Sequence, residues 1–156
     1  MYDKCTIGVI SDTHGLLRDE ALIALHEVDL IIHAGDVGGA DILPALEAIA
    51  PVVAVRGNVD RGPWSESLPM TETVETAAGL IHILHIRNDL SIVPGAADVR
   101  VVIYGHSHQP ENRERDGVLW LNPGSAGPRR FDLPVTLALL RIDGTSVRVE
   151  RVDLHV

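Results

Sequence analysis

Short apolar runs recur along the first third of this chain, and each is followed at once by small polar residues or histidine. The runs cover residues 5–11, 30–34 and 52–56 and are rich in β-branched side chains. Runs of this length and composition, bounded by turn residues, predict buried strands. Because such strands must be covered on both faces, this pattern restricts the fold to layered α/β arrangements.

The segments between these runs have the spacing of amphipathic helices. Residues 18–28 place apolar side chains three and four positions apart, which predicts one helix. Residues 40–50 predict a second, with Pro44 tolerated in its first turn and Pro51 ending it. Strand, helix, strand, helix and strand in this order predict a parallel sheet with right-handed crossovers.

The rest of the chain predicts further strands. Residues 61–76 are polar, contain two prolines and are expected to form an irregular loop. Asp143 and Gly144 predict a hairpin turn between the last two strands. Short connections favour antiparallel or mixed pairing, so we expect an α/β fold of two packed sheets with helices outside, in a single domain over residues 1–156. The strands are expected at residues 80–84, 99–104, 118–121, 135–142 and 146–152.

Composition excludes several classes of protein. The apolar fraction is 46%, yet no apolar run is long enough to cross a bilayer. The N-terminal run is too short for a secretory signal, so a cytoplasmic protein without membrane partners is expected. The net charge of −9 disfavours nonspecific nucleic-acid binding, which depends on cationic side chains. Cys5 is the only cysteine, which excludes an intramolecular disulfide and a zinc site built on several cysteines.

Metal-capable residues stand directly after five of the predicted strands. In open α/β sheets, ligands bind beyond the carboxyl ends of the strands, so these residues are expected to converge. Glycine precedes Asp36, Asn58 and His106 and permits tight backbone turns there. The clusters are Ser11 to His14, Gly35-Asp36, Gly57 to Asp60, His85 and Gly105 to His108.

Spacing within the clusters favours metal binding. Asp12 and His14 are two residues apart, and so are His106 and His108; side chains two apart in extended chain point to the same side. His82 and His85 point to opposite sides of a strand, and we expect His85 to face the site because it stands at the strand's end. Mixed imidazole and carboxylate ligands suit Mn, Fe, Zn, Co or Ni better than Ca.

The charge of such a centre suits a small phosphate-ester substrate. Two carboxylates, neutral imidazoles, two divalent ions and a bridging hydroxide give a net charge of about +1. An acidic protein would thereby present a small positive site to an anionic substrate.

The ordered motifs resemble the calcineurin-like metallophosphoesterases. The small size and the motif at residues 122–125 are similar to the compact bacterial and archaeal phosphodiesterase branch. The resemblance extends from Ile7 to about Arg130. It implies a four-layer α/β/β/α sandwich of two mixed sheets, and a dinuclear centre in which a metal-bridging hydroxide hydrolyses phosphodiesters or monoesters. The motifs are Asp12-x-His14, Gly35-Asp36, Gly57-Asn58-x-Asp60, His85, Gly105-His106-x-His108 and Asn122-Pro123-Gly124-Ser125.

The resemblance also implies a role for each residue. Manganese is the expected metal, with nickel, zinc, iron and cobalt as alternatives. Asp36 is expected to bridge the two ions, and Asn58 is also expected to face the phosphate. The candidate catalytic residues are Asn58, Asp60 and His106. One ion would be held by Asp12, His14, Asp36 and His108, and the other by Asp36, Asn58, His85 and His106.

The chain departs from the family's pattern at two positions that bear on chemistry. In many larger relatives, a histidine follows the asparagine of the third motif and helps to protonate the leaving group, whereas this chain has Val59. The proton is therefore expected from Asp60 or from water, or else the enzyme is expected to favour activated esters. A glycine usually follows the histidine of the fourth motif, whereas Ile86 follows His85 here.

Several polar residues have two interpretations. His33 is either a core residue or a hydrogen-bond partner that orients a ligand. Residues 122–125 form either a simple turn or a brace beneath the ligands. Arg129 and Arg130 are either solvated or in contact with a substrate phosphate. Trp64 either rims the pocket or caps the core.

A protein-interaction scaffold is the alternative function. One eukaryotic branch of this fold, the retromer subunit, keeps a degraded metal site and serves in protein assembly. The full set of candidate ligands in this chain favours the hydrolase. A homodimer is expected only because dimers are the commonest homo-oligomers.

Overall fold

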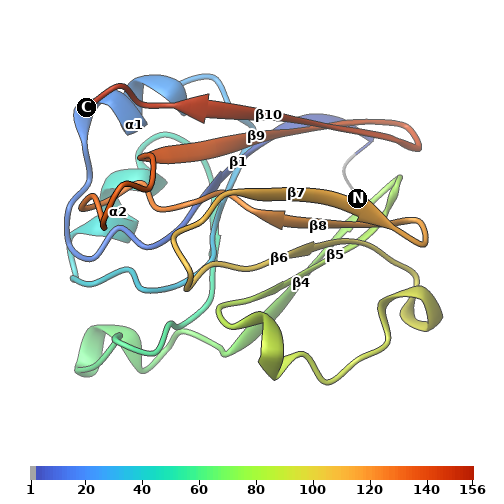
Figure 1. Cartoon of the computed structure of the whole chain (residues 1–156), viewed down its shortest axis with the longest axis horizontal. Helices are drawn as coiled ribbons and strands as arrows, with labels where there is room; N and C mark the ends of the chain where they lie inside the picture. The colour runs from blue at the N-terminus through green and yellow to red at the C-terminus, as the bar shows by residue number, and fades with distance from the viewer. Residues whose placement is uncertain (1–2) are drawn as a thin grey trace.

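Two five-stranded sheets pack face to face in the computed structural model, which describes residues 3–156 (Figure 1). The first sheet has the order β10-β9-β1-β2-β3. Its strands β1, β2 and β3 are parallel, and β9 and β10 extend it in antiparallel fashion. The strands are β1 (Lys4–Ile10), β2 (Leu30–His33), β3 (Val52–Ala54), β9 (Thr136–Asp143) and β10 (Ser146–Asp153).

The second sheet has the order β4-β5-β6-β8-β7. Its three central strands β5, β6 and β8 are parallel, and the edge strands β4 and β7 are antiparallel to their neighbours. Both sheets are therefore mixed, with a parallel centre. The strands are β4 (Thr71–Thr76), β5 (Gly79–Leu84), β6 (Val99–Ile103), β7 (Glu111–Arg115) and β8 (Val118–Asn122).

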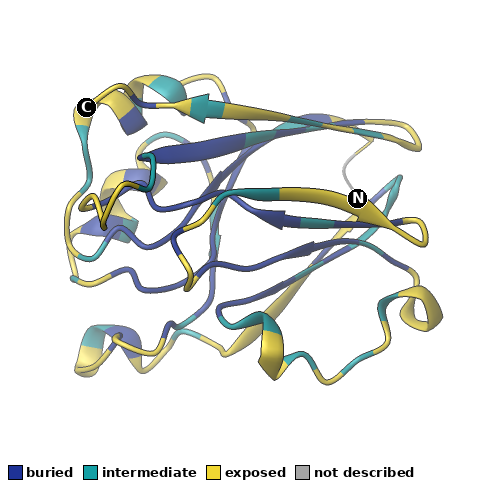
Figure 2. Ribbon diagram, viewed as in Figure 1, coloured by how far each residue is buried: buried dark blue, intermediate teal, exposed yellow. Residues whose placement is uncertain are grey.

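The main core lies between the two sheets. Alternate residues of the central strands point into it, among them Ile7 and Val9 of β1 and Val101 and Ile103 of β6, all completely buried. Figure 2 shows the central strands as buried along most of their length, whereas β7 and the hairpin turns are exposed. Burial on this scale supplies the largest favourable contribution to folding.

Different elements cover the two outer faces. Helices α1 (Asp19–Ala24) and α2 (Ile42–Glu47) pack on the first sheet. The segment between the 3₁₀ turns η2 (Arg87–Asp89) and η3 (Pro94–Ala97) covers the second sheet through Leu90 and Ile92. Another 3₁₀ turn, η1 (Pro63–Ser65), lies in the loop after β3. Within residues 3–156, no helix is long and apolar enough to span a membrane.

The α/β class and the two mixed sheets are confirmed, and the outermost layer over the second sheet is built from 3₁₀ turns. Helices α1 and α2 are shorter than the helices predicted at residues 18–28 and 40–50. After Ala24 the chain continues in tighter turns, in which the His26 amide donates to the Ile23 carbonyl three residues earlier (3.4 Å).

Strands β4 and β7 were not expected from the sequence. Residues 61–76 were predicted to be an irregular loop, but their last six form β4. In β4 only Val74 and Thr76 are buried, and β7 has no buried residue. An edge strand can be held by backbone pairing alone, so neither segment needs the apolar alternation that predicts a strand.

Candidate metal centre

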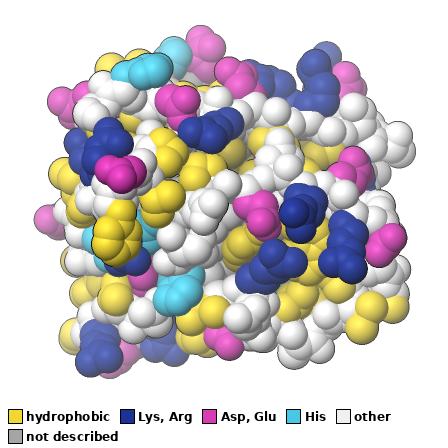
Figure 3. All heavy atoms as spheres, viewed as in Figure 1, with side chains coloured by type: hydrophobic (Ala, Val, Ile, Leu, Met, Phe, Trp, Pro, Cys, Tyr) yellow, Lys and Arg dark blue, Asp and Glu magenta, His cyan; other side chains and the backbone are white. Residues whose placement is uncertain are grey.

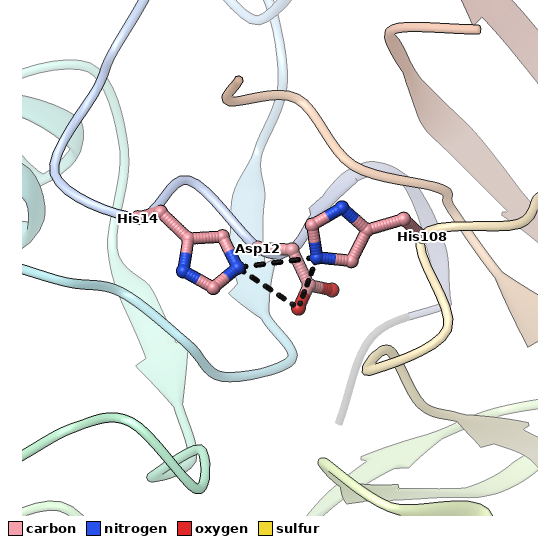
Figure 4. Close-up of side chains that lie close together, drawn as sticks. All are labelled: Asp12, His14 and His108. Atoms are coloured by element: carbon pink, nitrogen blue, oxygen red, sulfur yellow. Dashed lines mark hydrogen bonds and ion pairs between the residues drawn. The ribbon is translucent and has the colours of Figure 1, made fainter. Parts of the chain in front are cut away.

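Two groups of metal-capable side chains lie at the carboxyl ends of the parallel strands. One group is Asp12, His14 and His108, shown in Figure 4, and the other is Asp36, His85 and His106. Within each group the potential ligand atoms lie within 4.8 Å of one another. The loops after β1 and β2 in one sheet and after β5 and β6 in the other supply these residues.

The first group has the spacing of ligands around a common cation. The Nε2 atoms of His14 and His108 are 3.1 Å apart, and they lie 3.7 and 3.5 Å from Oδ1 of Asp12. Ligand atoms bound tetrahedrally at about 2.1 Å would be about 3.4 Å apart. Asp12 Oδ1 is buried without a hydrogen-bond partner, an arrangement that a bound cation would satisfy.

The second group is organised by His85. Its Nδ1 donates to the Ala34 carbonyl (2.7 Å), which leaves Nε2 with a free lone pair. This Nε2 is 3.1 Å from Asp36 Oδ2, but the pair lacks hydrogen-bond geometry, and the nitrogen is buried without a partner. On the open side of the group, His106 Nδ1 lies 3.1 Å from Asn58 Oδ1. The residues present therefore fit a second cation.

Asp36 stands between the two groups. Its Oδ2 is 3.1 Å from Nε2 of His85 and 3.7 Å from Nε2 of His14. Its Oδ1 accepts the Val59 amide (3.0 Å). Burial acts to raise the pKa of Asp36, but the nearby His85 and the Val59 amide outweigh it, so the pKa of Asp36 is lowered. The carboxylate is thus held ionised at the junction of the two groups.

Asp12, like Asp36, accepts hydrogen bonds through only one of its two carboxylate oxygens. Its Oδ2 accepts hydrogen bonds from Ser11 Oγ (2.6 Å) and from the His106 amide (3.1 Å). Its Oδ1 is left toward the two histidines of the first group. The His106 bond also ties the loop after β6 to the loop after β1, and so joins the two sheets at the site.

Two glycines allow the loops to approach this closely. A Cβ on Gly57 would lie 2.1 Å from Asp36 Oδ1, and a Cβ on Gly105 would lie 2.2 Å from Ser11 Oγ. Neither glycine has a positive φ, so the requirement there is space for the carboxylates. Only Gly35, with φ of 99°, has the turn conformation that the sequence led us to expect at all three positions.

The backbone is unusual at five of the candidate ligands. Positive φ is uncommon outside glycine, although aspartate and histidine tolerate it better than most residues. Its concentration here indicates that the surrounding fold imposes the backbone geometry of these residues, as is common at functional sites. The five residues are Asp12, His14, Asp36, His106 and His108, with φ between 47° and 73°.

His14, which is half-buried, and His85, which is buried, respond differently to their surroundings. Burial lowers the pKa of His14 and outweighs the opposite effect of Asp12 and Asp36. Burial also acts to lower the pKa of His85, but the carboxylates of Asp36 and Asp12 outweigh it, so the pKa of His85 is raised. The opposite directions of the two pKa shifts show that the carboxylates act more strongly on His85 than on His14.

Asp60 occupies a different environment from the other candidates. Its Oδ2 accepts the amides of Val37 (3.2 Å) and Gly57 (2.8 Å), and its Oδ1 accepts the amide of Gly38 (2.9 Å). Both carboxylate oxygens are therefore occupied by backbone donors from two loops. This arrangement ties the loop after β2 to the loop after β3.

His33 lies outside both ligand groups and supports them through hydrogen bonds to the neighbouring backbone and to Thr13. It is completely buried, and burial lowers its pKa to about 4. Its Nδ1 accepts the Gly35 amide (3.1 Å), so its Nε2 donates to Thr13 Oγ1 (3.0 Å). Thr13 in turn donates to the Val37 carbonyl (2.8 Å). This neutral network holds the chain on either side of Asp12, His14 and Asp36.

Residues 122–125 brace the site. Asn122 Nδ2 donates to the Gly105 carbonyl and to Ser107 Oγ, both at 3.1 Å, and so supports the loop that carries His106 and His108. Ser125 Oγ donates to the carbonyl of Asp12 (2.9 Å). The structure therefore favours the brace over the simple turn.

The remaining ambiguous residues make no hydrogen bond to either ligand group among residues 3–156, although the charge of Arg130 contributes to lowering the pKa of His14. Trp64 packs against the apolar cluster under the helices, as a cap on the core. Arg129 donates to the carbonyls of Leu133 (3.2 Å) and Val156 (2.6 Å), and Arg130 is exposed.

Sequence reasoning included Ser11 in the first cluster without assigning it a role, and it missed Arg87 and Glu111. Ser11, which fixes Asp12, stood next to it in the motif, and its role could have been found from that position. Arg87 and Glu111 line a pocket of about 310 Å³ beside His106. They are 24 residues apart and belong to no recognisable motif, so no sequence signal pointed to them.

Comparison with known proteins gives consistent matches. Residues 5–145 match the calcineurin-like phosphoesterase superfamily domain. A probable metallophosphoesterase of Methanothermobacter thermautotrophicus is 39% identical over 158 residues, covering 92% of this chain and 90% of the relative. A solved archaeal phosphodiesterase shares 25% identity and a TM-score of 0.77, covering 94% and 99% of the two chains. Vps29 of Entamoeba histolytica, solved with Zn²⁺, shares 26% identity and a TM-score of 0.74, covering 96% and 99%.

Proposed function

The chain belongs to the calcineurin-like phosphoesterase superfamily, and from this membership we propose that it hydrolyses phosphodiesters with the aid of two divalent metal ions. The observation that carries the proposal is the pair of histidine–carboxylate groups joined by Asp36. One group alone would fit a mononuclear site, but it would leave the ligand atoms of the other without a role.

The proposed ligand sets follow the geometry. Asp12, His14 and His108 would hold one ion, His85 and His106 the other, and Asp36 both. Asn58 would complete the second set through its carbonyl oxygen, which faces His106. Manganese is our choice of metal, on the strength of the family resemblance. When bound, the ions would supply Lewis acidity and an activated water.

The protein's own groups would then position the substrate. Asn58 is exposed beside His106, where its amide nitrogen can donate to a phosphate oxygen. Val59, which is 43% exposed, has no proton to offer. We assign the leaving-group proton to solvent, because both oxygens of Asp60 are occupied by backbone amides. Esters with acidic leaving groups should therefore react fastest.

Two hollows flank the centre and support a diester. The pocket of about 310 Å³ reaches His106 from one side. A smaller pocket of about 140 Å³ includes Asn58 and His85, together with the apolar side chains of Met70 and Leu84. A phosphate at the metal centre could place one ester arm in each hollow, whereas a monoester would leave one of them empty.

The test is hydrolysis by chelator-stripped protein with Mn²⁺, Ni²⁺, Zn²⁺ or Mg²⁺ added back. We expect turnover of bis(p-nitrophenyl) phosphate to return with metal and to exceed turnover of p-nitrophenyl phosphate. The His108→Ala variant should lose this turnover and part of the bound metal. His82→Ala is the matched control, because His82 lies on β5 outside both ligand groups. Equal metal content and turnover in His108→Ala would contradict the ligand assignment.

The alternative is a protein-interaction scaffold, favoured by the likeness to Vps29. Since that protein was solved with Zn²⁺, metal binding alone does not distinguish the two functions. Turnover does: a chain that binds two ions and hydrolyses no ester with any metal would support the scaffold.

We also propose that the chain forms one domain, because both sheets share one core.

A further inference from the structure

We propose that the pocket beside His106 is a subsite for a neutral, hydroxyl-rich ester arm, such as a sugar or an open-chain polyol. This inference rests on the proposed phosphodiesterase function and specifies the class of its substrate. The pocket has a volume of about 310 Å³, within the range of small-molecule sites, and includes His106 of the candidate centre. An arm bound here would therefore be continuous with a phosphate at that centre.

A partly exposed ion pair, Arg87 and Glu111, forms part of the pocket wall. Arg87 Nη1 lies 3.2 Å from Glu111 Oε1, which also accepts a hydrogen bond from the Tyr104 hydroxyl. The guanidinium carbon of Arg87 lies 4.8 Å from the centre of the Trp120 ring and 5.7 Å from that of Tyr104. Stacking and pairing together hold the guanidinium in one orientation before any ligand arrives.

The charges of this wall disfavour three kinds of occupant. Arg87 and Glu111 neutralise each other, so a second anionic group would gain from the arginine and lose to the adjacent carboxylate. A cationic arm would be attracted by the Glu111 carboxylate and repelled by the adjacent Arg87 guanidinium. An apolar arm would remove water from both charged groups without replacing their hydrogen bonds, which is costly. Figure 3 shows cationic side chains gathered in the region of β7, with acidic side chains beside them.

A hydroxyl group satisfies both members of the pair at once. It can donate to Glu111 Oε2, since both side-chain bonds of this carboxylate within residues 3–156 go to Oε1. It can accept at the same time from a remaining N–H of Arg87. Ser107 Oγ accepts hydrogen bonds from Asn122 and from the Gln109 amide, so its hydroxyl hydrogen is available to a second hydroxyl. The exposed side chains of Asn88 and Gln109 complete a wall of donors and acceptors.

The aromatic residues do not favour a stacked nucleobase. Trp120 is not among the residues that line the pocket, and the Arg87 guanidinium lies over its ring. Tyr104 is buried and turns its hydroxyl to Glu111. The recognition elements that remain are hydrogen-bonding groups, which match alcohol hydroxyls.

The experiment compares chromogenic diesters that share the p-nitrophenolate leaving group and differ in the other arm. The arms are p-nitrophenyl, glyceryl, uridine 5′ and 2′-deoxyuridine 5′. We expect kcat/KM for the glyceryl and uridine diesters to exceed that for the bis-aryl diester. Loss of the 2′-hydroxyl should lower kcat/KM on the order of tenfold, as expected for one hydrogen bond to charged groups. A glyceryl diester that surpasses the uridine diester would identify an open-chain polyol, and the reverse order a sugar.

The variant Glu111→Gln keeps the shape of the side chain and removes its charge. It should reduce the preference for hydroxyl-bearing arms over the aryl arm on the order of tenfold, with the bound metal unchanged. Glu114→Gln is the matched control, because Glu114 lies on the same strand and pairs with Arg100 (3.0 Å) outside the pocket. It should keep the wild-type preference.

The outcomes separate the subsite from the function that it refines. Hydrolysis of the bis-aryl diester without any preference for hydroxyl-bearing arms would overturn the subsite alone, as would an unchanged preference in Glu111→Gln. No hydrolysis of any diester by the metal-loaded protein would overturn the phosphodiesterase function, and the subsite with it.

Discussion

The candidate centre depends on carboxylates in which one oxygen accepts a hydrogen bond from the protein and the other is left to bind a metal ion. Asp12 is fixed through Oδ2 and Asp36 through Oδ1, each by a backbone amide of another loop. Asp60 shows the contrast, because backbone amides occupy both of its oxygens. The same residue type thus serves two purposes, and the number of amides around each carboxylate decides which.

The bridging role of Asp36 can be tested with Asp36→Asn. The variant keeps the size of the side chain but removes the charge between the two groups, so we expect loss of paired metal binding and a fall in kcat/KM of at least about a thousandfold. Metal content per chain and bis(p-nitrophenyl) phosphate hydrolysis measure the two effects. Asp41→Asn, at an exposed position without a capping hydrogen bond, is the control. Near wild-type turnover in Asp36→Asn would remove the dinuclear assignment.

The role of Asp60 can be separated from proton donation with Asp60→Asn. The variant loses an acceptor for the backbone amides, and we expect the free energy of unfolding to fall by about 1–3 kcal/mol. Hydrolysis of aryl and alkyl esters should slow by the same factor, because a positioning residue affects both equally. A selective loss for alkyl esters, which need a protonated leaving group more, would instead identify Asp60 as the general acid.

His33 should make stability depend on pH in a predictable direction. An unfolded histidine takes up a proton near pH 6.5, whereas burial lowers the pKa of His33 to about 4 in the folded state. Between these values the unfolded state binds more protons, so the free energy of unfolding falls as the pH falls. The contribution is present above pH 6.5 and lost toward pH 4, and amounts to about 3 kcal/mol.

Urea unfolding of metal-stripped protein at several pH values measures this contribution. In the wild type, keeping His33 neutral reduces stability only in acid, where the unfolded chain protonates this histidine. Relative to the wild type, His33→Gln should therefore lose more stability at pH 7 than at pH 4.5. His26→Gln, at an exposed histidine, should show the wild-type pH dependence. An unchanged slope in His33→Gln would show that His33 is not kept neutral by the fold.

At the scale of elements, the sequence predicted the buried strands well and the edges poorly. Strands β1, β2, β5 and β6 carry apolar runs because both of their faces are covered, and they place the metal-capable clusters at their ends. Strand β7 has no such signal, since its sequence Glu-Asn-Arg-Glu-Arg is almost entirely exposed. The pocket wall that β7 supplies through Glu111 was therefore beyond sequence reasoning.

The order of the loops could be predicted, but their contacts could not. Strand ends that share one edge follow from parallel pairing, which the alternating strands and helices predict. The hydrogen bond between the His106 amide and Asp12 joins residues 94 positions apart and depends on the packing of one sheet on the other. No local pattern encodes such a contact.

The loop after β6 provides a test at this scale. In Gly105→Ala, a Cβ would lie 2.2 Å from Ser11 Oγ and 2.6 Å from Asp12 Oδ2, so the loop must move away from Asp12. We expect a loss of stability of about 1–3 kcal/mol and a larger relative loss of activity. Gly95→Ala is the control, because a Cβ there meets nothing within 4 Å. Thermal denaturation and ester hydrolysis measure both, and wild-type behaviour of Gly105→Ala would show that the approach of the two loops is not needed.

At the scale of the molecule, the candidate centre lies where the two sheets meet. Asp12, His14 and Asp36 come from loops of the first sheet, and His85, His106 and His108 from loops of the second. Each ligand group contains residues from both sheets. Bound ions would therefore connect the two layers at one end of the core, in addition to any part in catalysis.

This arrangement predicts that metal stabilises the whole fold. Ions that bind only the folded state at a hundredfold excess over Kd add about 2.7 kcal/mol each, and 1 kcal/mol raises Tm by about 2–4 °C in a domain of this size. We expect chelation to lower Tm by roughly 5–20 °C and re-addition of metal to restore it. His108→Ala should show a smaller shift, whereas His82→Ala should keep the full one. An identical Tm with and without metal, at saturating metal content, would mean that the ions bind the folded and unfolded chains equally and do not connect the sheets.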